Sequence, residues 1–164
     1  MNSNTTTSEI MRSLEQVLEN SGVQAAVELL NARVPHRYTC VFELKGGVLR
    51  SLYVFDKQKQ FTPDSLKVVQ LKDSFCQFVL RDGIFATFSS SNDERVEDVK
   101  ATQAFDAYVG VPLLDNFGEI FGTLCHIDAS ALDLANEEFL IFERAGRLIP
   151  KFMSREIAAK LATS

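Results

Sequence analysis

Residues 108–128 constrain the fold of this 164-residue chain more than any other segment. Two runs rich in Val, Ile, Leu, Phe and Tyr lie on either side of the connector Asp115-Asn116-Phe117-Gly118. Because Asn and Gly tolerate the positive φ values of tight turns, this pattern predicts an antiparallel β-hairpin. Both arms are apolar at consecutive positions rather than at alternate ones. A strand of this kind is normally covered on both sides, so we expect other elements to pack on each face of the hairpin.

Composition and charge narrow the class of protein. The chain is 46% hydrophobic, enough for one domain whose core needs no disulfide or metal. Its net charge is -5 and the basic residues form no stripe, which disfavours nucleic-acid binding. No apolar run approaches the roughly 20 residues of a membrane helix, and the N-terminus lacks the pattern of a secretion signal. We therefore expect a cytoplasmic protein without a membrane or nucleic-acid partner, and its three unpaired cysteines fit a reducing compartment.

Helical periodicity dominates both ends of the chain. Residues 1–7 are polar and predict a disordered tail, so the single domain is expected to span 8–164 with Ser8 as the first N-cap. Apolar residues then recur at helical spacing to about Leu30, and Gly22 indicates either two helices or one interrupted helix. Residues 136–163 predict a long helix with a broad apolar stripe and a kink at Pro150.

The middle of the chain is rich in strand and turn signals. Residues 37–44 and 48–55 flank Lys45-Gly46-Gly47, which predicts a second hairpin. The following segment, 56–70, is expected to be a loop or a short helix.

The remaining central segment combines short helices with one further strand. Asp73 or Ser74 is expected to cap a short helix that Asp82-Gly83 ends, and 84–88 predicts another strand. A short helix with a loop is expected over 94–105. Strands joined by hairpins, with helices before, between and after them, favour an α+β fold with an antiparallel sheet.

The hairpin closely resembles the signature of the GAF family of small-molecule sensor domains, through Tyr108, Gly110-Val111-Pro112-Leu113, Gly122-Thr123-Leu124-Cys125 and Asp128. Further landmarks of that family follow in the expected order upstream: Leu30-Asn31, Pro35 to Thr39, Asp73 to Cys76, and Asn92 to Arg95. Together they cover roughly residues 10–160. The resemblance implies a sheet of about six strands, with the terminal helices on one face and a ligand-sized cavity under short helices on the other.

The resemblance also implies where a ligand would bind. The candidate ligand-binding residues are Asp73, Ser74, Phe75, Phe78, Asp93, Arg95, Tyr108 and Thr123. Arg95 is the most interesting of them, because a guanidinium can hold a carboxylate or phosphate with two hydrogen bonds. Helix capping, ion pairing and core packing account for the same residues without any ligand. Both interpretations remain open at this stage.

The adjacent pair Cys125-His126 calls for a chemical explanation, because a thiol beside an imidazole occurs in catalytic and metal sites. Consecutive residues of a strand point to opposite faces, so the two side chains cannot act together on one substrate. We expect Cys125 in the core and His126 as a hydrogen-bonded structural residue. The cysteines and histidines also lack the paired spacing of zinc sites. The sequence therefore predicts no catalytic residue, no metal and no cofactor.

These observations favour a stand-alone GAF domain that binds an unidentified small molecule. It would pass its state on through a homodimer of its terminal helices or through a partner, because the run Phe139 to Phe142 exceeds what one sheet face needs. A ligand-free interaction module is one alternative. Another is a redox enzyme that uses Cys76 or Cys125 and is related to free methionine sulfoxide reductase, although the cysteine-bearing loops of that family are missing from this sequence.

Overall fold

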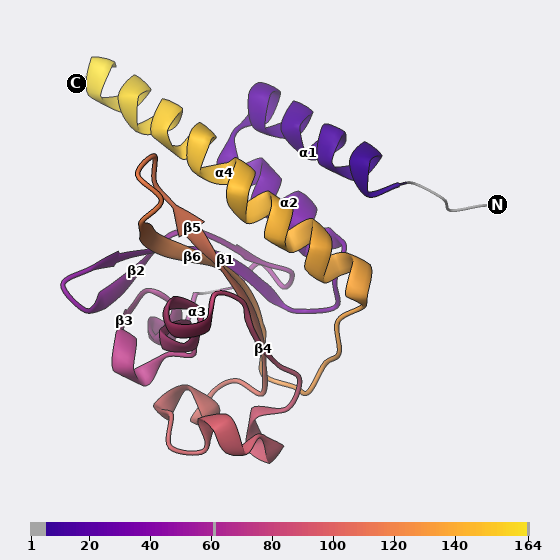
Figure 1. Ribbon diagram of the computed structural model, residues 1–164, viewed down its shortest axis with the longest axis vertical. Helices are drawn as coiled ribbons and strands as arrows, with labels where there is room; N and C mark the ends of the chain where they lie inside the picture. Colours follow the sequence, from indigo (N-terminus) through magenta and orange to yellow (C-terminus); the bar gives the residue numbers. More distant parts are fainter. Residues whose placement is uncertain (1–5, 61, 164) are drawn as a thin grey trace.

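One antiparallel sheet of six strands forms the centre of the computed structural model, which describes residues 6–60 and 62–163 (Figure 1). The strands lie in the order β3-β2-β1-β6-β5-β4. Their bounds are β1 (Tyr38–Lys45), β2 (Val48–Asp56), β3 (Val68–Gln70), β4 (Phe85–Thr87), β5 (Ala107–Leu114) and β6 (Ile120–Asp128). The predicted α+β class is confirmed.

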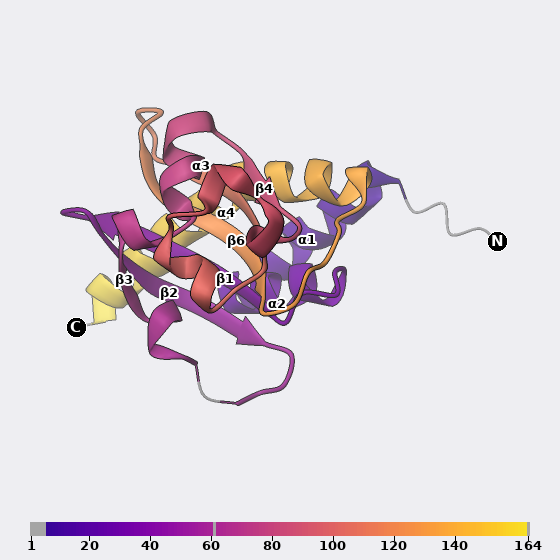
Figure 2. The ribbon, with the colours of Figure 1, turned by 90° about the horizontal axis from the view of Figure 1, so that it is seen from below.

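Two layers cover the sheet. Three helices, α1 (Thr7–Ser21), α2 (Val23–Ala32) and α4 (Asn136–Thr163), lie on one face, and α3 (Cys76–Asp82) lies on the other (Figures 1 and 2). Five short 3-10 turns also belong to the α3 side of the chain: η1 (Asp64–Leu66), η2 (Leu71–Asp73), η3 (Ser90–Asn92), η4 (Glu94–Val96) and η5 (Lys100–Gln103). No helix among residues 6–60 and 62–163 is long and apolar enough to cross a bilayer.

The predicted β5–β6 hairpin lies in the interior of the sheet, because β6 pairs with β1 on one side and with β5 on the other. Successive β6 residues divide between the two layers, as the alternation of a strand requires. Leu124 belongs to the core under α1, α2 and α4. Cys125 belongs to the core under α3. The expectation that both faces of the hairpin are covered is therefore confirmed.

Glycines set the turns of both hairpins. Gly46 and Gly47 have φ values of 58° and 74°, the left-handed pair that a two-residue hairpin needs. Gly118 has a φ of 80° in the β5–β6 connector. Gly22 has a φ of 91° and separates α1 from α2, and the Glu156 carboxylate then accepts the Val23 amide at 3.0 Å. The interruption of the first helix thus follows from one residue that can adopt this conformation.

The first helix begins earlier than expected. Its N-cap is Thr6, whose hydroxyl accepts the Glu9 amide at 3.1 Å, so the prediction of Ser8 as the cap was wrong. Both Thr and Ser can cap a helix, so residue type alone did not distinguish Thr6 from Ser8. Of the tail predicted over 1–7, residues 1–5 lie outside the described part of the chain, whereas Thr7 is helical.

Two central segments also differ from expectation. The segment 56–70, predicted as a loop or short helix, contains the edge strand β3, whose Gln70 pairs with Val48. The segment 94–105, predicted to hold a short helix, forms only two 3-10 turns. The long helix α4 has the expected bounds, and Pro150 lies inside it.

Candidate functional site

A cavity of about 470 Å³ opens on the α3 face of the sheet, within the range of sites for small molecules. Polar residues that are exposed surround its mouth, among them Asp64, Gln70, Lys100 and Gln103. Buried side chains form its inner wall, which we call the cavity floor: Phe42, Phe75, Cys76, Tyr108 and Ile127. The cavity thus combines charged groups of both signs at the entrance with an apolar, aromatic interior.

The Cys76 thiol contacts two hydroxyl groups at the cavity floor. Its Sγ lies 3.1 Å from the Tyr108 hydroxyl and 3.2 Å from the Thr123 hydroxyl. The Ser74 hydroxyl accepts the Cys76 amide at 2.9 Å and so holds the start of α3 in place. These contacts tie α3 to the two strands of the predicted hairpin, because Tyr108 comes from β5 and Thr123 from β6.

Gly110 makes room for this arrangement. A Cβ at Gly110 would lie 2.7 Å from Cζ of Tyr108, closer than carbon atoms approach, so only glycine lets the Tyr108 ring lie flat over β5. Gly110 pairs with Cys125 in β6, and Cys125 pairs in turn with Cys40 in β1. The Tyr108 hydroxyl therefore lies above a row of residues that contains two further thiols.

Cys76 and Cys125 differ in their acid–base behaviour. Burial raises the pKa of the Cys125 thiol well above its ordinary value. Burial acts in the same sense on Cys76, but hydrogen bonds from the side chains of Cys125, Ser74, Thr123 and Tyr108 outweigh it and lower the Cys76 pKa. Cys76 consequently becomes a thiolate more readily than Cys125 does.

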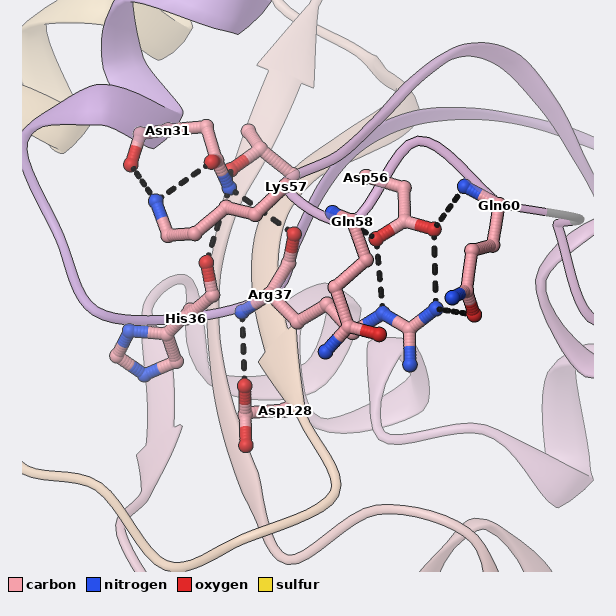
Figure 3. Close-up of polar contacts among 9 residues, drawn as sticks. Asn31, His36, Arg37, Asp56, Lys57, Gln58, Gln60 and Asp128 are labelled. Carbon is pink, nitrogen blue, oxygen red and sulfur yellow. Dashed lines mark hydrogen bonds and ion pairs between the residues drawn. The ribbon is translucent and has the colours of Figure 1, made fainter.

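A separate polar network joins α2 to the ends of β1, β2 and β6 (Figure 3). The Lys57 ammonium donates to the backbone carbonyl and to the side-chain carbonyl of Asn31, at 2.6 and 2.7 Å. Arg37 forms a two-point ion pair with Asp56, at 2.8 and 3.1 Å. The Arg37 hydrogen bond lowers the pKa of Asp56 to about 2, and the Asp128 carboxylate accepts the Arg37 amide at 2.8 Å.

This network reaches His126 on the helix-covered face. The Asn31 amide donates to the Thr39 hydroxyl at 2.8 Å, and that hydroxyl shares a hydrogen bond of 2.7 Å with Nδ1 of His126. The His126 ring stacks on Phe142 at 3.9 Å between ring centroids. Burial lowers the pKa of His126 far below its ordinary value. The prediction of a hydrogen-bonded structural histidine is confirmed.

No protein-family model and no curated protein matches the chain in sequence. Solved structures do resemble it. The GAF domain of an Acinetobacter phosphoenolpyruvate-protein phosphotransferase aligns with 94% of this chain and 96% of its own, with a TM-score of 0.72 and 14% identity. A domain of a putative two-component sensor histidine kinase protein from Sinorhizobium meliloti aligns with 92% of this chain and 97% of its own, with a TM-score of 0.64 and 12% identity.

The chain has the fold of a GAF domain. The same fold also serves an enzyme. Free methionine-R-sulfoxide reductase from Neisseria meningitidis, in complex with its substrate, aligns with 97% of this chain and 95% of its own, at a TM-score of 0.74 and 11% identity. At such identities the likeness describes the fold alone, and function has to be argued from the residues of the site.

The GAF fold brings half of the predicted ligand-binding residues to the cavity. Asp73, Ser74, Phe75 and Tyr108 line it. Thr123 lies beneath it, fully buried behind Cys76. The other three candidates lie elsewhere: Phe78, Asp93 and Arg95.

Neighbouring residues of the chain bind the Arg95 side chain. Its guanidinium donates to the Asp93 carboxylate at 2.6 and 3.0 Å and to the Ala86 carbonyl at 2.8 Å, and it lies over the Phe85 ring. Asp93 also accepts the Arg95 amide at 3.0 Å, which begins the turn η4. Phe78 packs against Phe85, with 4.8 Å between ring centroids. The observed contacts of Phe78, Asp93 and Arg95 are thus ion pairing, capping and core packing. These are the contacts that the ligand-free interpretation gave for them.

Several cavity residues were not anticipated from the sequence. Asp64, Gln70, Lys100 and Gln103 come from η1, β3 and η5, which carry no family landmark. Cys76 belongs to a landmark, but the sequence suggested its thiol for redox catalysis and not for a ligand-binding cavity. The odd number of buried cysteines was the one hint, because Cys40, Cys76 and Cys125 are all free and all belong to the core under α3. Within the described residues, no group of three acidic, cysteine or histidine side chains is arranged to hold a metal ion.

Proposed function

We propose that this GAF domain is a sensory module that binds a small molecule in the cavity under α3. The observation that carries the proposal is the cavity itself, whose volume of about 470 Å³ suits a ligand of metabolite size. A ligand-free module would gain stability by filling such a space, since an unfilled apolar cavity costs free energy. Neighbouring domains with this fold come from a phosphotransferase and from a sensor histidine kinase protein, which supports a regulatory role.

The lining of the cavity describes the ligand that fits it best. The floor offers the faces of Phe42, Phe75 and Tyr108, which favour a flat apolar or aromatic body. The mouth offers the Lys100 ammonium together with the carboxylates of Asp64 and Asp73. A ring would pack on the aromatic floor, an anionic group at one end of it would pair with the Lys100 ammonium, and hydrogen-bond donors beside that group would bind the carboxylates. We therefore propose a compact aromatic or heterocyclic metabolite that carries a carboxylate or a phosphate.

The proposal also includes an output surface on the C-terminal half of α4. A groove of about 440 Å³ runs there beside the tip of the β5–β6 hairpin. Its lining includes Phe117, which is 90% exposed, and Ile157, which is 52% exposed. Most of the apolar run expected to drive dimerisation is used inside the chain, since Ile141 and Phe142 are buried. The exposed groove is thus the surface that supports a homodimer.

Dimerisation is tested by light scattering of the chain at micromolar concentration. The double variant Phe117→Ser, Ile157→Asp should be monomeric if the groove is the interface. Ile84→Asp is the matched control, because Ile84 is 38% exposed and does not line the groove. A wild-type monomer, or a dimer that survives the double variant, would remove this part of the proposal.

The role we propose is regulatory rather than catalytic. The similar reductase structure is the reason to test this point directly. Incubation of the chain with free methionine sulfoxide and a thiol reductant should give no turnover above the reagent background. Turnover that disappears in Cys76→Ala would instead establish the enzyme.

Ligand binding is tested by a thermal-shift screen of nucleotides, aromatic acids and other metabolites. Ala101 belongs to η5 and lines the cavity, so Ala101→Trp should occupy the space and abolish any shift. Ala129→Trp places the same ring on an exposed loop and should respond as the wild type does. Shifts that are equal in all three proteins would show binding elsewhere, and no shift with any compound would favour the ligand-free module.

A further inference from the structure

The three cysteines lie at and beneath the inner wall of the cavity, in the core under α3. Cys76 lines the cavity, whereas Cys40 and Cys125 do not. Cys125 lies two residues along β6 from Thr123, whose hydroxyl is 3.2 Å from the Cys76 sulfur, and alternate residues of a strand share one face of the sheet. Cys40 and Cys125 are direct partners across β1 and β6, and the Cys125 thiol points to the Cys40 carbonyl at 3.8 Å. One thiol therefore lines the cavity, and the other two belong to the same buried core under α3.

Cys76 forms part of the inner wall of the cavity. Its side chain is 1% exposed, so solvent meets only its edge, in the cavity as well as at the outer surface. The cavity of about 470 Å³ is many times the roughly 30 Å³ that one water molecule occupies in the liquid. The cavity volume therefore accommodates a peroxide, which is little larger than water, and the exposed edge of Cys76 is where the two would meet.

The surroundings of Cys76 stabilise the thiolate, which is the reactive form. The hydroxyls of Tyr108 and Thr123 lie within hydrogen-bond distance of Sγ, at 3.1 and 3.2 Å. Neither hydroxyl has another side-chain partner among the described residues, so both can donate to the sulfur. No comparable donors surround Cys40, whose side chain is completely buried.

We propose that Cys76 is an oxidant-sensitive thiol and that Cys125 resolves its oxidised form as a disulfide. This inference stands whether or not the cavity also binds a metabolite. It assigns a modification site to the chain and names hydrogen peroxide, or another small hydroperoxide, as the reactant.

The chemistry balances in two steps. The Cys76 thiolate attacks one oxygen of the peroxide, so that an S–O bond forms and the O–O bond breaks. The sulfur is oxidised to a sulfenic acid by two electrons, and the other oxygen leaves as hydroxide, which takes a proton to become water. The Cys125 sulfur then attacks the Cys76 sulfur. The S–S bond forms, the S–O bond breaks, and the departing hydroxide takes the Cys125 proton to form a second water.

The test treats the folded full-length chain with equimolar hydrogen peroxide at pH 7 and locates the products by peptide mass spectrometry. The wild type should lose two mass units through a link between Cys76 and Cys125. Cys40→Ser should form the same link. Cys125→Ser should instead accumulate a sulfenic acid at Cys76, which dimedone traps as an adduct.

A second variant tests the donors around the thiol. Tyr108→Phe removes one hydroxyl while it keeps the ring, so Tyr108 serves as a positioning residue for the thiolate. The pH midpoint of Cys76 alkylation by iodoacetamide should rise by about one unit, since one donor to the thiolate is lost. A midpoint unchanged in Tyr108→Phe would contradict the role of that donor.

Two results would overturn the proposal as a whole. One is that no cysteine reacts with peroxide until the chain is unfolded in urea. The other is that the first product links Cys40 to Cys125 while Cys76 stays reduced. If Cys125→Ser does not fold, the time course of the wild type and of Cys40→Ser decides the question, because a Cys76 adduct must precede the link.

Discussion

His36 provides the sharpest test of the physical account, because its environment is unfavourable for a charged ring. The side chain is completely buried, and neither ring nitrogen has a hydrogen-bond partner among the described residues. Burial lowers the pKa of His36 from 6.5 to about 4, with a smaller opposing effect from Asp128 and a smaller supporting one from Lys57. The folded chain thus binds this proton about 2.5 pH units below the point at which the unfolded chain binds it.

The sign and size of the effect follow from this difference. Above pH 6.5 the ring is neutral in both states and contributes no pH dependence. As the pH falls from 6.5 towards 4, the unfolded state gains the proton first, so stability is lost progressively, up to about 3 kcal/mol. About 2 kcal/mol of this is lost between pH 7 and pH 4.5. The paired carboxylates of Asp56 and Asp93, with pKa values of about 2, lose their contributions only at lower pH.

The variant His36→Leu removes the titrating ring and keeps a similar volume. At pH 7 its stability should lie within about 1.5 kcal/mol of the wild type, because no hydrogen bond is lost. Urea unfolding at pH 7, 5.5 and 4.5 measures the free energy of unfolding of both proteins. Its decrease from pH 7 to pH 4.5 should be about 2 kcal/mol smaller in the variant than in the wild type.

His126 supplies the comparison. His126→Leu should cost about 1 to 2 kcal/mol at pH 7, since it removes the ring nitrogen that shares a hydrogen bond with the Thr39 hydroxyl. In the same acid series both variants should lose less stability than the wild type, because burial lowers the pKa of both rings. The two variants should differ in their stability at pH 7. Parallel pH profiles of the wild type and of His36→Leu would refute the reasoning.

Further predictions concern glycines and the polar network. Gly110→Ala should destabilise the fold by about 1 to 3 kcal/mol, because its Cβ would collide with the Tyr108 ring, and urea unfolding measures this. The loss should be smaller when Tyr108 is also changed to Ala. Gly122→Ala should cost more than Gly110→Ala in the same assay, because its Cβ would meet the Phe42 carbonyl, and backbone cannot turn aside as a side chain can. Asn31→Ala should cost about 2 to 3 kcal/mol, since it removes one of the two acceptors of the Lys57 ammonium and the donor to the buried Thr39 hydroxyl, and calorimetry would show a lowered Tm.

Local sequence signals predicted most of the fold. The pair Gly46-Gly47 and the connector that ends at Gly118 identify the two hairpins, because their turns need positive φ values that glycine adopts readily. The edge strand β3 was missed because it is three residues long and is defined by its pairing with β2, a contact that no local pattern encodes. The family resemblance implied about six strands, but it did not show where in the sequence the sixth strand lies.

The candidate site was predicted less well, because the contacts of its side chains depend on neighbours that the sequence pattern does not reveal. Arg95 has the chemistry of an anion ligand, yet Asp93 lies two residues away and engages it first. The Cys76 thiol depends on Tyr108 and Thr123, which are 32 and 47 residues distant in the chain. Lys100 and Gln103 reach the cavity from a turn whose conformation follows from packing. Such groups become visible only when the fold is known.

The central claim is that the cavity under α3 holds a small molecule. Native mass spectrometry of the freshly purified full chain tests it most directly, with Ala101→Trp and Ala129→Trp prepared in parallel. A retained mass that is present in the wild type and in Ala129→Trp, and absent from Ala101→Trp, is the predicted result. A retained mass that persists unchanged in Ala101→Trp would contradict the account, as would an apo mass for all three proteins even after incubation with every compound of the metabolite panel.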